Sequence, residues 1–163
     1  MQPRILSVVR HAHADTARPG QEDADRPLSG RGQKEATLAA SGFAAAAHDP
    51  YPDLLLASPS RRTRASADAF AQSLGLGGGA VQFDDRLYLA PVDTLLEVLQ
   101  ASADAHRHIV VIGHNPGLRD FVRTLTGDPD ATDLPTAGVR SFRCDIRHWR
   151  DLRPGSCRPL GPG

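Results

Sequence analysis

Two strand-like segments of the sequence end in residues that could do chemistry. An apolar run, "ILSVV", is followed at once by Arg10 and His11, and a second run, "HIVVI", is followed after one glycine by His114. Between them, "SPSRRTRAS" carries Arg62 among several arginines where a helical pattern starts. Arginine forks bind phosphoryl oxygens in pairs, and a neutral histidine can act as a nucleophile. These residue types predict a site that binds a phosphoryl group and accepts it.

The elements that carry these residues must bring them to one place. Short, continuous, β-branched runs are typical of strands that are buried on both faces. In an open α/β sheet, ligands bind beyond the carboxyl ends of the strands, where the N-termini of helices also gather. The patterns predict strands at 5–9, 53–59 and 109–112, a weaker extended piece at 81–83, and helices near 31–47, 60–75, 91–103 and 117–125.

The alternation of strands and helices predicts an α/β fold, a three-layer α/β/α sandwich with a mostly parallel central sheet. From Gly138 onward the alternating pattern indicates one or two more strands, which allows an antiparallel strand at the edge of the sheet. A chain of 163 residues suits a single domain spanning 1–163. The Pro- and Gly-rich stretch from about 153 to 163 is expected to be an irregular tail.

Composition narrows the classes of partner. Lys plus Arg and Asp plus Glu number 19 each, so no global field favours nucleic acid or an anionic membrane. Cys144 and Cys157 form no disulfide-scaffold pattern, which favours a reduced compartment. No apolar run approaches the length of a membrane span or of a secretory signal. We therefore expect a cytoplasmic protein with no nucleic-acid or membrane partner, and a monomer by default.

Four motifs resemble those of one family. "RHAHAD", "DADRPLSGRGQKEA", "SPSRRTRASA" and "GHNPGL" occur in the order and spacing of the histidine phosphatase superfamily, whose fold is phosphoglycerate-mutase-like. The small size and the "DxxRPLS" loop resemble the compact SixA-type phosphohistidine phosphatases, and the resemblance extends to Trp149. It implies a hydrolase that needs no metal or cofactor and removes the phosphoryl group from phosphohistidine in a protein. A small phosphoester substrate on the same fold is the alternative.

The resemblance also assigns roles to matching positions. His11 would be the nucleophile that forms a phosphohistidine intermediate, and Arg10 and Arg62 would hold the phosphoryl oxygens. His114 would bind the phosphoryl group and stabilise the charge of the transition state. Arg26 of the "DxxRPLS" loop would reach the substrate phosphate.

The sequence departs from the family pattern at two points. Ala12 follows the nucleophile where glycine is usual, and its methyl group is tolerated only if the backbone there is not left-handed. No residue clearly matches the carboxylic acid with which larger members protonate an oxygen leaving group, although Asp84, Asp85 and Asp93 lie in the corresponding region. This absence fits a phosphoramidate, whose imidazole leaving group can be protonated without a strong dedicated acid.

Two other functions compete with this one. "HAHAD" resembles the start of metallo-β-lactamase-like zinc sites, with His11, His13 and Asp15 as ligands. Thr16 stands where that pattern continues with histidine, and the arginines would repel a metal ion; His13 is expected at the rim of the site. A non-catalytic phosphoprotein-binding module on the same fold is the second alternative. The other histidines of the C-terminal half are expected at the surface or at strand ends: His106, His108 and His148.

Overall fold

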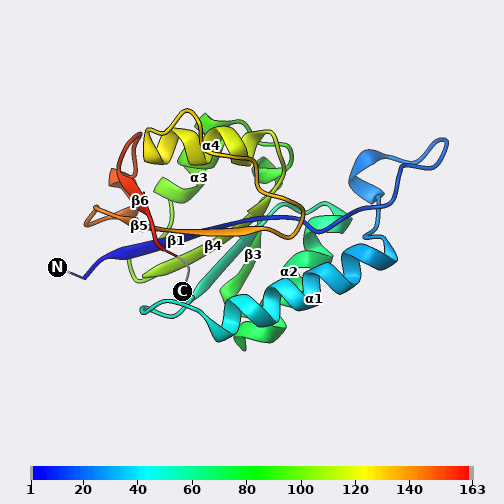
Figure 1. The fold of residues 1–163 in the computed structure, drawn as a ribbon, viewed down its shortest axis with the longest axis horizontal. Helices are drawn as coiled ribbons and strands as arrows, with labels where there is room; N and C mark the ends of the chain where they lie inside the picture. Colours follow the sequence, from blue (N-terminus) through cyan, green and yellow to red (C-terminus); the bar gives the residue numbers. More distant parts are fainter. Residues whose placement is uncertain (1, 162–163) are drawn as a thin grey trace.

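A six-stranded sheet forms the centre of the computed structural model, which describes residues 2–161 (Figure 1). The strand order is β3-β2-β4-β1-β5-β6. The first four strands are parallel, β5 runs antiparallel to β1, and β6 runs antiparallel to β5. The predicted mostly parallel sheet with an antiparallel edge is thus confirmed. The strands are β1 (Arg4–Arg10), β2 (Leu54–Ala57), β3 (Val81–Phe83), β4 (His108–Gly113), β5 (Val139–Cys144) and β6 (Cys157–Pro159).

Helices cover both faces of the sheet and complete the three layers (Figure 1). Helices α1 (Gly30–Ala45) and α2 (Arg61–Leu74) pack on one face, and α3 (Val92–Gln100) and α4 (Gly117–Thr126) pack on the other. Successive residues of β4 therefore meet different helices: Val110 lies in the cluster with α1 and α2, and Val111 in the cluster with α3 and α4. This is why the central strands are apolar without alternation. No helix within residues 2–161 is long and apolar enough to cross a membrane.

Serine caps fix where the two helices nearest the site begin. The Ser29 hydroxyl accepts from the N–H of Gly32 at 2.9 Å, and Ser60 caps α2 in the same way. A Cβ at Gly32 would lie 1.9 Å from the carbonyl oxygen of His13, so only glycine lets α1 approach the segment that follows β1. The cap at Ser60 places Arg62 in the first turn of α2.

The C-terminal stretch differs from the prediction of an irregular tail over 153–163. Cys157–Pro159 form β6, which pairs with β5 so that Cys157 faces Cys144. Both cysteines are buried, and their sulfur atoms lie 2.7 Å apart. A strand of three residues among Pro and Gly has too little sequence pattern to be recognised, because only its pairing with β5 defines it.

His108 lies at a strand end, one of the two positions expected for it, but not at the surface. It starts the central strand β4 and is fully buried. Its Nε2 lies 2.7 Å from the Ser7 hydroxyl and its Nδ1 lies 2.9 Å from the Pro50 carbonyl oxygen. These partners satisfy the hydrogen-bonding groups of the His108 ring, which is covered by the neighbouring strands and by the segment before β2. His108 is therefore a structural residue.

Candidate active site

The structure brings Arg10, His11, Arg62 and His114 together at the carboxyl ends of the parallel strands. Arg10 ends β1 and pairs in register with Gly113 of β4, so the histidine that follows each strand lies beside the other. The ring centroids of His11 and His114 are 5.3 Å apart. The Arg62 side chain reaches them from α2, with Nη2 3.3 Å from Nδ1 of His114.

The His11 ring is held in one orientation by the backbone that follows it. Its Nδ1 lies 2.7 Å from the carbonyl oxygen of Ala12, which can only accept, so Nδ1 carries the proton and Nε2 keeps its lone pair. The N–H of Ala12 donates to the Ser66 hydroxyl at 3.0 Å, and that hydroxyl donates to the carbonyl oxygen of Arg62 at 2.8 Å. Ala12 is fully buried and is not among the residues with positive φ, so alanine fits here without backbone strain.

Both histidines of the site are held neutral. Burial is the main cause that lowers the pKa of His11 to about 4, and the positive charges of Arg62, Arg10 and Arg26 lower it further. Burial also lowers the pKa of His114 to about 3, with contributions from His11 and Arg62. Near neutral pH the Nε2 atom of His11 is therefore available to attack an electrophile.

This protonation state can be checked by an NMR titration of the histidine rings. The folded-state pKa of His11 is depressed, so the ring should stay neutral as the pH falls through 6.5 and gain its proton only near 4. The buried neutral ring contributes to the stability of the folded protein above pH 6.5, and this contribution is lost as the pH falls toward 4. Comparison with the His11→Asn variant assigns the signal. A midpoint close to the unperturbed value would contradict the burial argument.

His114 has a protein partner at each ring nitrogen. Nδ1 receives the contact from Arg62, whose guanidinium can only donate, so the proton is on Nε2 and points to the Ser58 hydroxyl at 2.8 Å. The sequence did not single out Ser58, although it directly follows β2 at the same edge of the sheet. The contact with Arg62 is long for a hydrogen bond, so a phosphoryl oxygen can compete for it.

Arg10 and Arg62 each have a buried N–H donor without an acceptor among the described residues. The Nε atoms of Arg10 and Arg62 are buried and have no hydrogen-bond partner among residues 2–161. Arg10 is otherwise held by the carbonyl oxygen of Leu134 at 3.1 Å. Buried unpaired donors are costly and rare in folded proteins. Oxygens of a tetrahedral anion beside His11 would satisfy both.

A carboxylate that the sequence analysis did not single out connects Arg62 to the "DxxRPLS" loop. Arg62 donates from Nη1 to the carbonyl oxygen of Asp23 at 2.8 Å and from Nη2 to its carboxylate at 2.9 Å. The Tyr88 hydroxyl donates to the same carboxylate and is the main cause of its lowered pKa. Arg26 donates to Asp23 at 2.9 Å and to the carbonyl oxygen of Asp15 at 2.8 Å. Asp23 is the first residue of the "DxxRPLS" motif, and this motif is the signal from which the sequence could have identified it.

The acids considered as proton donors lie in other surroundings. Asp84 accepts from Arg86, and these hydrogen bonds hold the pKa of its carboxyl below the usual range. Asp85 and Asp93 are exposed. Among residues 2–161, none of these three carboxyl groups makes a hydrogen bond with His11.

The zinc interpretation finds no ligand group. Nδ1 of His13 lies 2.7 Å from the Ser29 hydroxyl, whereas His11 is held by Ala12, and Asp15 is exposed. Within residues 2–161, no three His, Cys, Asp or Glu side chains are arranged to hold a metal ion. His13 instead connects the segment after β1 to the cap of α1.

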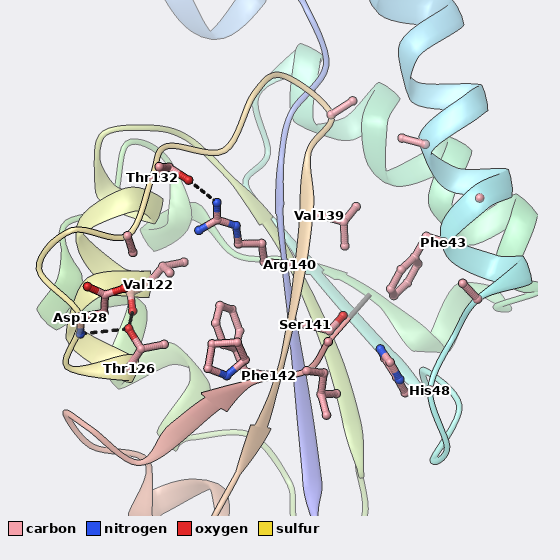
Figure 2. A pocket seen from close by; sticks show the side chains of 18 of the residues that line it. Phe43, His48, Val122, Thr126, Asp128, Thr132, Val139, Arg140, Ser141 and Phe142 are labelled. Atoms are coloured by element: carbon pink, nitrogen blue, oxygen red, sulfur yellow. Dashed lines mark hydrogen bonds between the residues drawn. The ribbon is translucent and has the colours of Figure 1, made fainter. Parts of the chain in front are cut away.

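A groove of about 760 Å³ lies apart from this cluster, along β5 between α1 and the loop that follows α4. In Figure 2, Val139 and Ser141 project from β5 toward Phe43, and Arg140 and Phe142 project to the opposite side. None of the four clustered site residues lines it. The candidate site is therefore defined by its side chains and not by the volume of a cavity.

Comparison with known proteins identifies the family. Residues 6–88 match the family model of the Histidine phosphatase superfamily (branch 1). An uncharacterised protein of Mycobacterium tuberculosis is 32% identical over an alignment of 161 positions, and the alignment covers 91% of this chain and 96% of that protein. The chain belongs to the histidine phosphatase superfamily. The family predicted from the motifs is thus confirmed, and the superfamily membership supports phosphatase activity.

Solved histidine phosphatases agree over almost the whole chain. A SixA structure from Agrobacterium tumefaciens has a TM-score of 0.78 at 26% identity and covers 99% of this chain and 100% of that one. A second, from Nakamurella multipartitia, has a TM-score of 0.79 at 25% identity, with 99% and 98% covered. The SixA-type resemblance is therefore confirmed. A mycobacterial glucosyl-3-phosphoglycerate phosphatase, at 19% identity and a TM-score of 0.71 with 97% of each chain covered, shows the shared fold alone.

Proposed function

We propose that this phosphatase removes phosphoryl groups from phosphohistidine in a protein and that His11 is its nucleophile. The observation that carries the proposal is the set of groups around Nε2 of His11. This nitrogen is unprotonated because the proton of the neutral ring is on Nδ1, which donates it in a hydrogen bond to the Ala12 carbonyl oxygen. Two buried arginine Nε–H groups that have no partner among residues 2–161 lie in the same cluster. A nucleophile and anion-binding donors are the two parts that phosphoryl transfer needs.

The proposed reaction has two steps. In the first, Nε2 of His11 forms a bond to phosphorus while the bond from phosphorus to the substrate nitrogen breaks, and the leaving imidazole takes a proton from water. In the second, water attacks phosphorus, the His11–phosphorus bond breaks, and inorganic phosphate leaves. Arg10 and Arg62 donate to the equatorial oxygens in both steps and stabilise their charge. His114 binds an oxygen in the tautomer that carries its proton on Nδ1.

The leaving group of the substrate is inferred from the surroundings of the carboxyl groups that could protonate it. Asp84 is ionised against Arg86, so it is a poor proton donor for an alkoxide. An imidazole leaving group needs no strong enzyme acid, which favours a phosphoramidate over an unactivated sugar phosphate. The likeness to SixA structures supports the same substrate, since SixA is a protein histidine phosphatase. The fold alone also accommodates a small phosphoester, as in glucosyl-3-phosphoglycerate phosphatase.

Phosphate release from a phosphohistidine peptide and from an aryl phosphate, each with and without EDTA, tests the proposal. We expect release that EDTA does not change and that is faster from the peptide. Loss of activity with EDTA would favour a metal site at "HAHAD" instead. Faster release from the aryl phosphate would favour a phosphoester substrate, and no release from either would favour a phosphoprotein-binding module.

A further inference from the structure

Asp23 occupies one edge of the Arg62 guanidinium and leaves the other free. It accepts from Nη1 with its backbone oxygen and from Nη2 with its carboxylate, at 2.8 and 2.9 Å. Nε of Arg62 is buried and has no partner among residues 2–161, and Nη2 also lies 3.3 Å from His114. A guanidinium is rigid and planar. Holding its end therefore fixes the direction in which Nε points.

Other groups fix Asp23 in turn. Its carboxylate accepts from Arg26 at 2.9 Å and from the Tyr88 hydroxyl, so donors from two separate segments hold it. These contacts hold the pKa of Asp23 below its usual range, and it stays ionised. The negative charge beside an anion site is offset by the two arginines that it contacts. A carboxylate held this firmly is suited to aligning Arg62.

We propose that Asp23 is a positioning residue that turns the free edge of Arg62 toward the phosphoryl group. The inference rests on the proposed function for its role in turnover, but it makes a separate statement about anion binding. Without the carboxylate, Arg62 keeps its charge and its contact with the Asp23 backbone oxygen, but Nη2 loses the charged partner that completes the alignment of Nε. Asp23 touches no reacting atom, so its effect must pass through Arg62.

The Asp23→Asn variant tests the inference, since it keeps the size of the side chain and removes its charge. We expect the Kd of inorganic phosphate, measured by calorimetry, to rise at least about ten-fold, and kcat/KM to fall by a similar factor, because misalignment of a clamp is costly. Asp25→Asn is the matched control. Asp25 lies in the same 3-10 turn with an exposed side chain and should leave both quantities and the Tm unchanged.

A double-mutant cycle shows whether the effect passes through Arg62. Arg62→Lys keeps a positive charge but has no planar fork to align. In that background, Asp23→Asn should cause almost no further loss of phosphate affinity. An equal loss in both backgrounds would overturn the inference, and so would an Asp23→Asn enzyme with unchanged phosphate affinity.

The outcomes separate this inference from the proposed function. If the wild type turns over substrate and Asp23→Asn matches it in phosphate binding and rate, the positioning role fails and the phosphatase proposal stands. If the wild type releases no phosphate from any substrate but Asp23→Asn still weakens binding of inorganic phosphate through Arg62, the phosphatase proposal fails and the positioning role stands.

Discussion

The His11→Ala variant should lose at least about four orders of magnitude in kcat, on the order of what removal of a covalent nucleophile costs. Among the described residues, Nε2 of His11 is the one group of the cluster that is oriented, neutral and without a hydrogen-bond partner. Arg10, Arg62 and His114 would still bind the substrate, so KM should change far less than kcat. Steady-state kinetics on a phosphohistidine peptide give both quantities.

His13→Ala is the matched control for this substitution. His13 lies two residues further along the same segment, and its ring contacts the Ser29 hydroxyl outside the cluster. This variant should keep most of the activity, and circular dichroism should show both variants folded. Substantial turnover by folded His11→Ala would refute its role as nucleophile. Peptide mapping after an acid-free quench should locate the phosphoryl group on His11 in the wild type.

Arg62→Ala should lower kcat by about two to three orders of magnitude, which corresponds to about 3–4 kcal/mol of transition-state stabilisation from a preorganised donor. Arg62 is 3% exposed and contacts His114 and Asp23, and its Nε is buried without a partner among residues 2–161. The other arginines of α2, Arg61 and Arg64, are exposed. The loss should appear in kcat and in the affinity for inorganic phosphate.

Arg61→Ala supplies the comparison within the same helix. Arg61 precedes Arg62 in the first turn of α2 but is exposed, so it carries the same charge without reaching the cluster. Its removal should leave kcat nearly unchanged, because an exposed charge is screened. If Arg61→Ala and Arg62→Ala lowered kcat equally, the effect of Arg62 would be a general effect of positive charge and not specific binding of the phosphoryl group.

Much of the fold could be predicted because its signals are local. The continuous apolar runs predicted β1, β2 and β4, and the helical pattern near 60–75 predicted the bounds of α2 within one residue. The motifs at the strand exits predicted which residues would meet. Parallel pairing of β1 and β4 then brought His11 and His114 together, as the α/β rule requires.

Other features depend on contacts between distant parts of the chain. Tyr88 contacts Asp23 across 65 positions, and neither side chain has a local pattern that reveals the other. The same reason explains why Cys144 and Cys157 were not expected to meet, since β6 is defined by pairing and not by composition.

The sequence by itself determined the family, the order of strands and helices, and the residue types at the end of each strand. Only the tertiary structure decided the chemical state of those residues. His11 is neutral because folding buries it beside arginines from other elements, and its proton is on Nδ1 because the Ala12 carbonyl oxygen accepts there. The end of the Arg62 guanidinium is held because the loop before α1 brings Asp23 onto it. Protonation and direction are set by neighbours in space, which a local pattern does not specify.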